Sequence, residues 1–259
     1  MASNILIIVE GYKTESKFFN KFLNVFDLNF DIYCFGANIY TLYKDLKAID
    51  FNGDLKDILA ETYPSKKSIL SKKYAYTYLI FDCDAHHPKK NDNRNIDAIV
   101  ADNIQKLIEM ANYFTDETDP SKGKLYINYP MMESYRDCDH FFEDKYSETT
   151  VAINELSLYK SRVAHRNICR IHINEYTKEN FTLLILQNIY KLNKIYSNNW
   201  NKLNYEEYMQ YSDTCKILSK QHDMIKTTGL ISVINTSLFL ITDYYGNEEN
   251  FYDSLKLIV

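Results

Sequence analysis

A short, uninterrupted apolar run near the N-terminus ends abruptly on an acidic residue. Residues 4–9 read NILIIV, and Glu10 and Gly11 follow directly. A run of this length without polar alternation is typical of a parallel strand that is buried on both faces. Such a strand needs neighbouring strands beside it and helices above and below it. The run therefore predicts an α/β fold.

Three later segments are predicted as further strands of the same sheet. Residues 30–35 (FDIYCF), 76–81 (YTYLIF) and 124–128 (KLYIN) are short and mostly rich in aromatic and β-branched residues. Helical periodicity lies between them, notably across residues 14–26 and 96–114. Strands that alternate with helices predict right-handed βαβ units and a parallel sheet flanked by helices.

The pattern changes after about residue 145. From there the spacing of apolar residues predicts helices, over residues 150–160, 178–197, 205–222 and 230–245. We therefore expect an α/β core over residues 1–145 and a mainly helical C-terminal region over residues 146–259.

Composition narrows the class of protein. The chain has 259 residues, of which 46% are hydrophobic, enough for one large domain or a core with a smaller appendage. Five cysteines, an odd number without a Cys-x-x-Cys pair, indicate reduced thiols and a cytoplasmic location. The N-terminus lacks the basic segment and cleavage site of a signal peptide. The apolar stretch 230–241 is too short and too polar to span a bilayer.

The charge balance limits how the chain could bind nucleic acid. A formal charge of −5 argues against coating nucleic acid by bulk electrostatics, so such a site must be a local basic patch. Lys160, Arg162, Arg166 and Arg170 form one candidate patch, in a stretch without acidic residues. The alternative interpretation is an ordinary solvated face.

Acidic side chains follow two of the predicted strands. Glu10 comes directly after the first, and Asp82 and Asp84 come directly after the strand at residues 76–81. Carboxyl ends of parallel strands meet at one edge of a sheet, where sites of α/β proteins form. Clustered carboxylates repel each other unless a cation lies between them, and hard oxygen ligands suit Mg²⁺ or Mn²⁺. Each acid alone also fits a helix cap or a turn residue.

The same residues carry a resemblance to a known family. Residues 5–11 (ILIIVEG), followed by Thr14-Glu15 and Phe18-Phe19, resemble the opening of Toprim domains, especially small Toprim nucleases related to bacterial anti-phage defence proteins. Phe81-Asp82-Cys83-Asp84 resembles their second motif. The resemblance covers roughly residues 4–135. It implies a Toprim (Rossmann-like) core, a catalytic role with metal for Glu10, and Mg²⁺ binding by Asp82 and Asp84.

A third segment extends the resemblance to the RloB-like branch of these proteins. Residues 128–134 (NYPMMES) are similar to its Asn-x-Pro-x-x-Glu segment, although Met132 stands where an aromatic residue usually precedes the acid. The resemblance implies Glu133 as a fourth metal ligand.

The function implied by the resemblance is Mg²⁺-dependent or Mn²⁺-dependent cleavage of DNA or RNA in bacterial anti-phage defence. Such nucleases are often controlled by a partner, frequently an ATPase. The chain has no phosphate-binding Walker motif, so ATP dependence would require a separate ATPase chain. Whether the chain forms a homo-oligomer stays open.

Three alternatives remain. A phosphatase of the haloacid dehalogenase type also places Asp-x-Asp after an apolar strand, but leaves Glu10 unexplained. A zinc site could use Cys138, His140, His165, Cys169 and His172, although their spacing fits no standard zinc motif. A non-catalytic Toprim-like module that binds or regulates is the third alternative.

Overall fold

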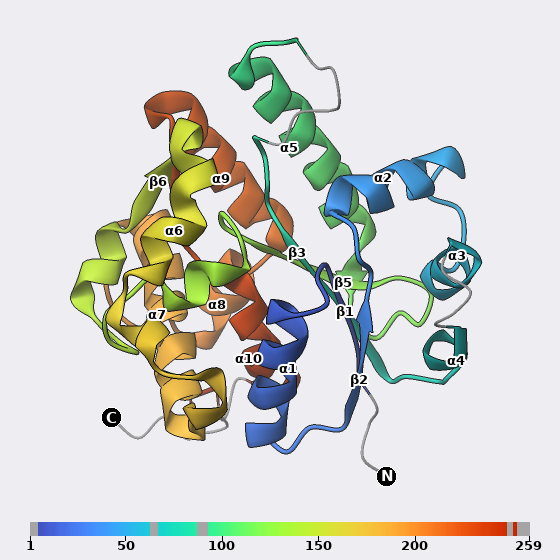
Figure 1. Cartoon of the computed structure of the whole chain (residues 1–259), viewed down its shortest axis with the longest axis horizontal. Coiled ribbons are helices and arrows are strands. Elements are labelled where there is room, and N and C mark those ends of the chain that lie inside the picture. The colour runs from blue at the N-terminus through green and yellow to red at the C-terminus, as the bar shows by residue number, and fades with distance from the viewer. Residues whose placement is uncertain (1–4, 63–66, 87–92, 248–250, 253–259) are drawn as a thin grey trace. The chain divides into compact units, whose positions relative to one another are not determined.

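The computed structural model describes residues 5–62, 67–86, 93–247 and 251–252 (Figure 1). The chain divides into two compact units. Unit 1 comprises residues 1–82 and 105–126, and unit 2 comprises residues 83–104 and 127–259. This division differs from the boundary expected near residue 145, because residues 83–104 and 127–145 both group with unit 2.

The described residues of unit 1 are built on a five-stranded sheet with the order β2-β1-β3-β5-β4. The strands are β1 (Ile5–Val9), β2 (Phe30–Cys34), β3 (Tyr76–Asp82), β4 (Thr115–Asp116) and β5 (Gly123–Asn128), the last two residues of β5 belonging to unit 2. Strand β1 is parallel to β2 and to β3, with Ile7 opposite Ile32 on one side and Tyr78 on the other. The α/β class and the pairing of the first and third predicted strands are thereby confirmed. Strand β4, which is not among the predicted strands, is a short antiparallel addition to β5.

Burial of β1 explains its composition. All five of its residues are fully buried, which is possible only if helices cover both faces of the sheet. Helices of unit 1 are α1 (Thr14–Val25), α2 (Ile39–Ala48), α3 (Leu55–Thr62), α4 (Lys67–Leu70) and the second half of α5 (Ile96–Tyr113). Right-handed connections from β1 to β2, and from β2 back across β1 to β3, put their helices on opposite faces. Figure 1 shows α1 on one side of β1 and β2, and α3 and α4 on the other.

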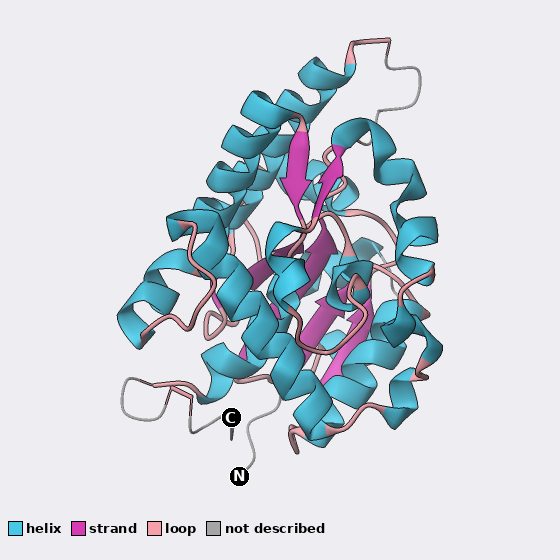
Figure 2. Ribbon diagram, turned by 90° about the vertical axis from the view of Figure 1, so that its left-hand side faces the viewer, coloured by secondary structure: helices cyan, strands magenta, loops and turns pink. Residues whose placement is uncertain are grey.

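Unit 2 is mainly helical, as expected (Figure 2). Its helices include α6 (Tyr159–Ala164), α7 (Lys178–Ser197), α8 (Tyr205–Tyr211), α9 (Thr214–Thr228) and α10 (Phe239–Tyr245). Helix α7 begins where predicted, because Thr177 and Asn180 cap each other's backbone N–H groups at 3.2 and 2.9 Å. Within the described residues, none of the helices combines the length and the apolar character that crossing a bilayer requires.

Three predicted helices of unit 2 were wrong in detail. The segments predicted as helices from residues 150 and 230 begin instead as strands β6 (Thr150–Ala152) and β7 (Leu230–Ser232), which pair antiparallel. Gly229 ends α9 with φ +70° and so stops the helical path before β7. The helix predicted over residues 205–222 breaks at Asp213, whose carboxylate accepts the Lys216 N–H at 2.9 Å and begins α9.

Candidate functional site

Glu10 and Asp82 lie at the carboxyl ends of neighbouring parallel strands in unit 1. Val9, the last residue of β1, is opposite Ile80 of β3, so both strands end at the same edge of the sheet. The backbone N–H of Asp82 lies 3.4 Å from Oε2 of Glu10. Asp82 is 8% exposed, and Glu10 is half-buried. The structure thus brings together these two predicted site residues.

A third carboxylate, which sequence reasoning did not assign to the site, lies next to Glu10. A Cβ atom placed on Gly11 would lie 2.6 Å from Oε2 of Glu15, so the Glu15 carboxylate rests against the backbone that follows Glu10. Glycine leaves the space that Glu15 occupies. The available signal was the Thr14-Glu15 pair, which belongs to the segment that resembles the opening of Toprim domains.

Asp84, the second residue of unit 2, has an unusual backbone conformation. Its φ is +38°, a left-handed value that aspartate tolerates better than most residues. Both neighbours are anchored within unit 2. The Cys83 N–H donates to the Asn128 carbonyl at 3.0 Å, and the Ala85 carbonyl accepts from Nδ2 of Asn103 at 3.0 Å. The backbone on either side of Asp84 is therefore held in place.

Glu133 is a buried carboxylate with one unsatisfied oxygen. It lies on the 3₁₀ helix η2 (Met132–Arg136) and is 5% exposed. Its Oε1 lies 3.3 Å from Nζ of Lys160, and its buried Oε2 has no hydrogen-bond partner among the described residues. A buried carboxylate oxygen in this state favours a cation or another donor beside it.

A buried amide holds the segment that carries Glu133. Nδ2 of Asn235 donates to the Met132 carbonyl at 2.9 Å and to Oγ of Ser134 at 3.1 Å. The Asn235 N–H in turn donates to Oδ1 of Asn188 at 2.7 Å. Asn235 thus ties both neighbours of Glu133 to the core of unit 2, which restricts where the Glu133 carboxylate can point.

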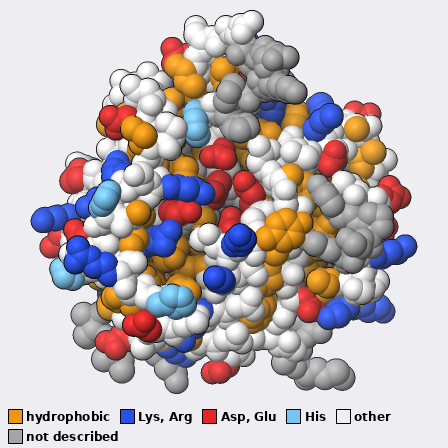
Figure 3. All heavy atoms as spheres, viewed as in Figure 1, with side chains coloured by type: hydrophobic (Ala, Val, Ile, Leu, Met, Phe, Trp, Pro, Cys, Tyr) orange, Lys and Arg blue, Asp and Glu red, His pale blue; other side chains and the backbone are white. Residues whose placement is uncertain are grey.

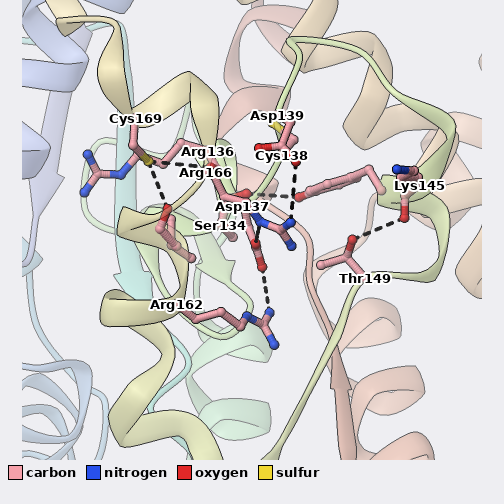
Figure 4. A network of polar contacts seen from close by, with 12 residues as sticks. Ser134, Arg136, Asp137, Cys138, Asp139, Lys145, Thr149, Arg162, Arg166 and Cys169 are labelled. Atoms are coloured by element: carbon pink, nitrogen blue, oxygen red, sulfur yellow. Dashed lines mark hydrogen bonds and ion pairs between the residues drawn. The ribbon is translucent and has the colours of Figure 1, made fainter.

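Two of the four predicted nucleic-acid contacts are bound to a buried aspartate (Figure 4). Asp137 has no exposed surface, and its carboxylate accepts Nη2 of Arg162 at 2.6 Å and Nε of Arg166 at 2.8 Å. Burial opposes the charged form of Arg166, but the hydrogen bond and the charge of Asp137 raise its pKa. Sequence reasoning missed Asp137, since nothing marks it among the acids of its segment.

The other two basic residues of the run have different surroundings. Lys160 pairs with Glu133, whereas Arg170 is exposed at the end of the 3₁₀ helix η5 (Asn167–Arg170). Figure 3 shows Lys and Arg side chains interspersed with Asp and Glu, with no uniformly basic face in this view. The four residues therefore differ in their environment, and a shared contact with nucleic acid stays a prediction.

No ligand set for a metal is complete in the described part of the chain. There, no group of three or more His, Cys, Asp and Glu side chains lies close enough together to hold an ion. Glu10 and Asp82 approach each other, but the predicted convergence of Glu10, Asp82 and Asp84 stays a prediction. Carboxylates repel each other when no cation lies between them.

The zinc alternative gains no support from the cysteines involved. Burial strongly raises the pKa of the Cys138 thiol. Cys169 donates its S–H to the Val163 carbonyl at 3.2 Å, and burial raises its pKa as well. Zinc ligation requires thiolates, which both environments disfavour.

Comparison with known proteins gives no family assignment. No family model matches the sequence, and neither a curated protein nor a solved structure matches it significantly. The class that fold and site define is an α/β protein with two acidic residues, Glu10 and Asp82, at the carboxyl edge of its sheet.

Proposed function

We propose that this chain is a metal-dependent nuclease that cleaves phosphodiester bonds of DNA or RNA. The observation that carries the proposal is the approach of Glu10 and Asp82 at the carboxyl ends of adjacent parallel strands. In sheets of this kind, substrates and cofactors bind at that edge. The motif resemblance to Toprim nucleases supports the same conclusion.

The chemistry of the predicted ligands suits Mg²⁺ or Mn²⁺. Glu10 and Asp82 offer hard carboxylate oxygens, and Asp84 and Glu133 stay predicted ligands on sequence grounds. The buried Oε2 of Glu133, which has no partner among the described residues, has the chemistry of a cation ligand. When bound, the ion would neutralise charge that develops on the phosphoryl group. Glu10 and Asp82 would orient it, and Lys160, Arg162, Arg166 and Arg170 stay predicted contacts with nucleic acid on sequence grounds.

The resemblance extends the proposal to biological context. We place the activity in the cytoplasm, as an effector in bacterial anti-phage defence, with any ATP dependence supplied by a separate ATPase chain. The location, the defence role and the ATPase do not affect the chemistry proposed for the acids, which can be tested on the isolated protein.

Metal binding and cleavage should be measured separately. We expect the wild type to bind Mn²⁺ in calorimetry and to cleave mixed DNA and RNA oligonucleotides with Mg²⁺ or Mn²⁺. Glu10→Gln and Asp82→Asn should lose both properties and keep the circular dichroism of the wild type. Glu61→Gln, an exposed acid on α3, is the matched control and should change neither.

Other outcomes assign other functions. Mn²⁺ binding without cleavage of any oligonucleotide would indicate a non-catalytic module. Release of phosphate from a chromogenic monoester, without oligonucleotide cleavage, would indicate a phosphatase. Full activity of Glu10→Gln would remove the main support for the nuclease.

A further inference from the structure

Unit 2 contains an open depression with a volume of about 270 Å³. It is lined by Lys145, Glu148, Thr149, Thr150, Arg162 and Arg166. All six side chains belong to unit 2, and the acids proposed to bind metal are not among them. The depression is therefore distinct from the acids proposed to bind metal.

Its lining carries more cationic than anionic side chains, although the chain as a whole is acidic. Three cationic side chains line it, against the single carboxylate of Glu148. That carboxylate already has a partner outside the lining, since Lys194 Nζ lies 2.8 Å from its Oε1. The buried carboxylate of Asp137 and the carboxylate of Asp139, whose Oδ2 lies 3.7 Å from Nη1 of Arg166, offset part of this positive charge, so the lining offers cationic donors without a large positive field.

The two guanidinium groups are positioned before any ligand arrives. Asp137 lies fully buried beneath them and binds one nitrogen of each, at 2.6 and 2.8 Å. Arg162 also donates from Nη1 to the Thr150 carbonyl at 3.0 Å and stacks over the Tyr159 ring at 4.9 Å. Each arginine has five N–H donors, so several remain for another acceptor. Their side chains are 35% and 34% exposed, so part of each guanidinium can reach a ligand, whereas Nε of Arg162 is buried and Nη1 of Arg166 lies 3.7 Å from Oδ2 of Asp139.

The opposite wall is anchored as well. It is formed by the 3₁₀ helix η3 (Asp144–Glu148) and the residues after it. Lys191 donates from Nζ to the carbonyls of Tyr146, Ser147 and Thr149 at 3.2, 2.7 and 3.0 Å. Lys145, exposed on this wall, can therefore extend towards the arginines from a fixed backbone.

We infer that this depression binds a phosphate group of a nucleic-acid backbone, between Lys145 on one side and Arg162 and Arg166 on the other. Planar guanidinium groups bind phosphate oxygens in pairs, and lysine adds a mobile point charge. Nucleic acid as the source of the phosphate rests on the proposed nuclease function. The depression supplies a binding contact beyond the acids that would hold the metal.

The arginines themselves are poor test positions, because removing them leaves Asp137 buried without a partner. Lys145→Gln and Glu148→Gln avoid this difficulty, since both side chains are exposed. Lys216→Gln, at an exposed lysine of α9, makes the same charge change elsewhere and serves as the control. All three changes are made in a Glu10→Gln background, with Mg²⁺ present, so that oligonucleotides stay intact.

Binding of labelled DNA and RNA oligonucleotides is then measured by fluorescence anisotropy at several salt concentrations. Lys145→Gln should raise Kd about fivefold and reduce the slope of log K against log salt by about one. Glu148→Gln should lower Kd about threefold, a gain that damage to the fold would not produce. Lys216→Gln should bind as the background does.

Unchanged Kd and slope in both Lys145→Gln and Glu148→Gln would overturn the inference, as would absence of binding to either oligonucleotide. A cleavage assay of the protein with native Glu10 distinguishes failure of the nuclease proposal from failure of the phosphate-site proposal. If that protein cleaves and the two variants bind normally, the nuclease stands and the phosphate site falls. If it does not cleave but the variants shift binding as expected, the phosphate site stands and the nuclease falls.

Discussion

The guanidinium of Arg162 lies 2.6 Å from the carboxylate of Asp137, and that carboxylate has no exposed surface. Arg166 completes the cluster from the other side at 2.8 Å. A buried carboxylate must be neutralised whether or not a ligand binds. The two arginines therefore have a structural role in unit 2 that is independent of any contact with phosphate.

Removing both arginines should destabilise the protein strongly. We expect Arg162→Ala combined with Arg166→Ala to lower the free energy of unfolding by about 3 kcal/mol, because Asp137 stays buried without a partner. Arg170→Ala, at an exposed residue of the same run, should change it by less than about 0.5 kcal/mol. Urea denaturation with both slope and midpoint measured provides the test. Equal stability of the double variant and Arg170→Ala would contradict this role.

The stability of the protein should rise with pH above neutrality because of Lys191. Burial lowers the pKa of Lys191 to about 7 from 10.5. Between these values the unfolded chain binds more protons than the folded one, so the free energy of unfolding increases with pH. Below pH about 7 the lysine is charged in both states, and its contribution is constant.

The contribution of Lys191 to the pH dependence of the unfolding free energy can be measured with Lys191→Met, because methionine does not titrate. The difference between wild type and variant, followed by urea denaturation from pH 6.5 to 9.5, should grow in favour of the wild type. The slope should not exceed about 1.4 kcal/mol per pH unit. The three carbonyl acceptors favour the ammonium form, so a flat difference would mean that they outweigh burial.

Neutralising Glu133 should stabilise the metal-free protein. Lys160 pairs with Oε1, but the buried Oε2 has no partner among the described residues, so Glu133→Gln can replace that unsatisfied oxygen by an amide of lower desolvation cost. We expect a gain of about 1 kcal/mol in EDTA, or roughly 2–4 °C in the melting temperature. Adding Mn²⁺ should raise the melting temperature of the wild type more than that of the variant. Equal shifts would exclude Glu133 as a ligand.

Asp84 should tolerate asparagine better than a branched apolar residue. Its φ of +38° suits Asp and Asn, whereas valine there should cost about 1–2 kcal/mol. Asp84→Asn should therefore keep wild-type stability while raising the Mg²⁺ concentration needed for cleavage. Thermal melts and metal titrations of both variants separate the backbone effect from the ligand effect. An unchanged metal requirement in Asp84→Asn would remove Asp84 from the proposed site.

The acids at the sheet edge could be predicted because their positions follow from local sequence. An apolar run defines β1, another defines β3, and parallel pairing brings the residues after them to one edge. Glu10 and Asp82 needed no knowledge of distant contacts for this prediction. Predicting the role of Asp137 would have required knowledge of distant contacts, because its partners lie 25 and 29 residues further along the chain. No periodicity in the sequence encodes that pairing.

The strands β6 and β7 escaped prediction for the same reason. Each has three residues, too few to show the alternation of a strand. Each is stabilised by the other, with Val151 opposite Ile231. Apolar residues around them fit a helical spacing equally well, and the tertiary pairing decided the outcome.

The division of the chain has a consequence for its synthesis. The polypeptide passes from unit 1 to unit 2 at residue 83, returns at 105 and leaves again at 127. Strand β6 can pair only after β7 has been synthesised. Met132 and Ser134 likewise gain their hydrogen bonds only when the amide of Asn235 is present. On the ribosome, unit 2 can therefore complete these contacts only after Asn235 has emerged. A nascent chain stopped before residue 230 would present an open strand edge, and we expect such products to be recognised by chaperones and degraded.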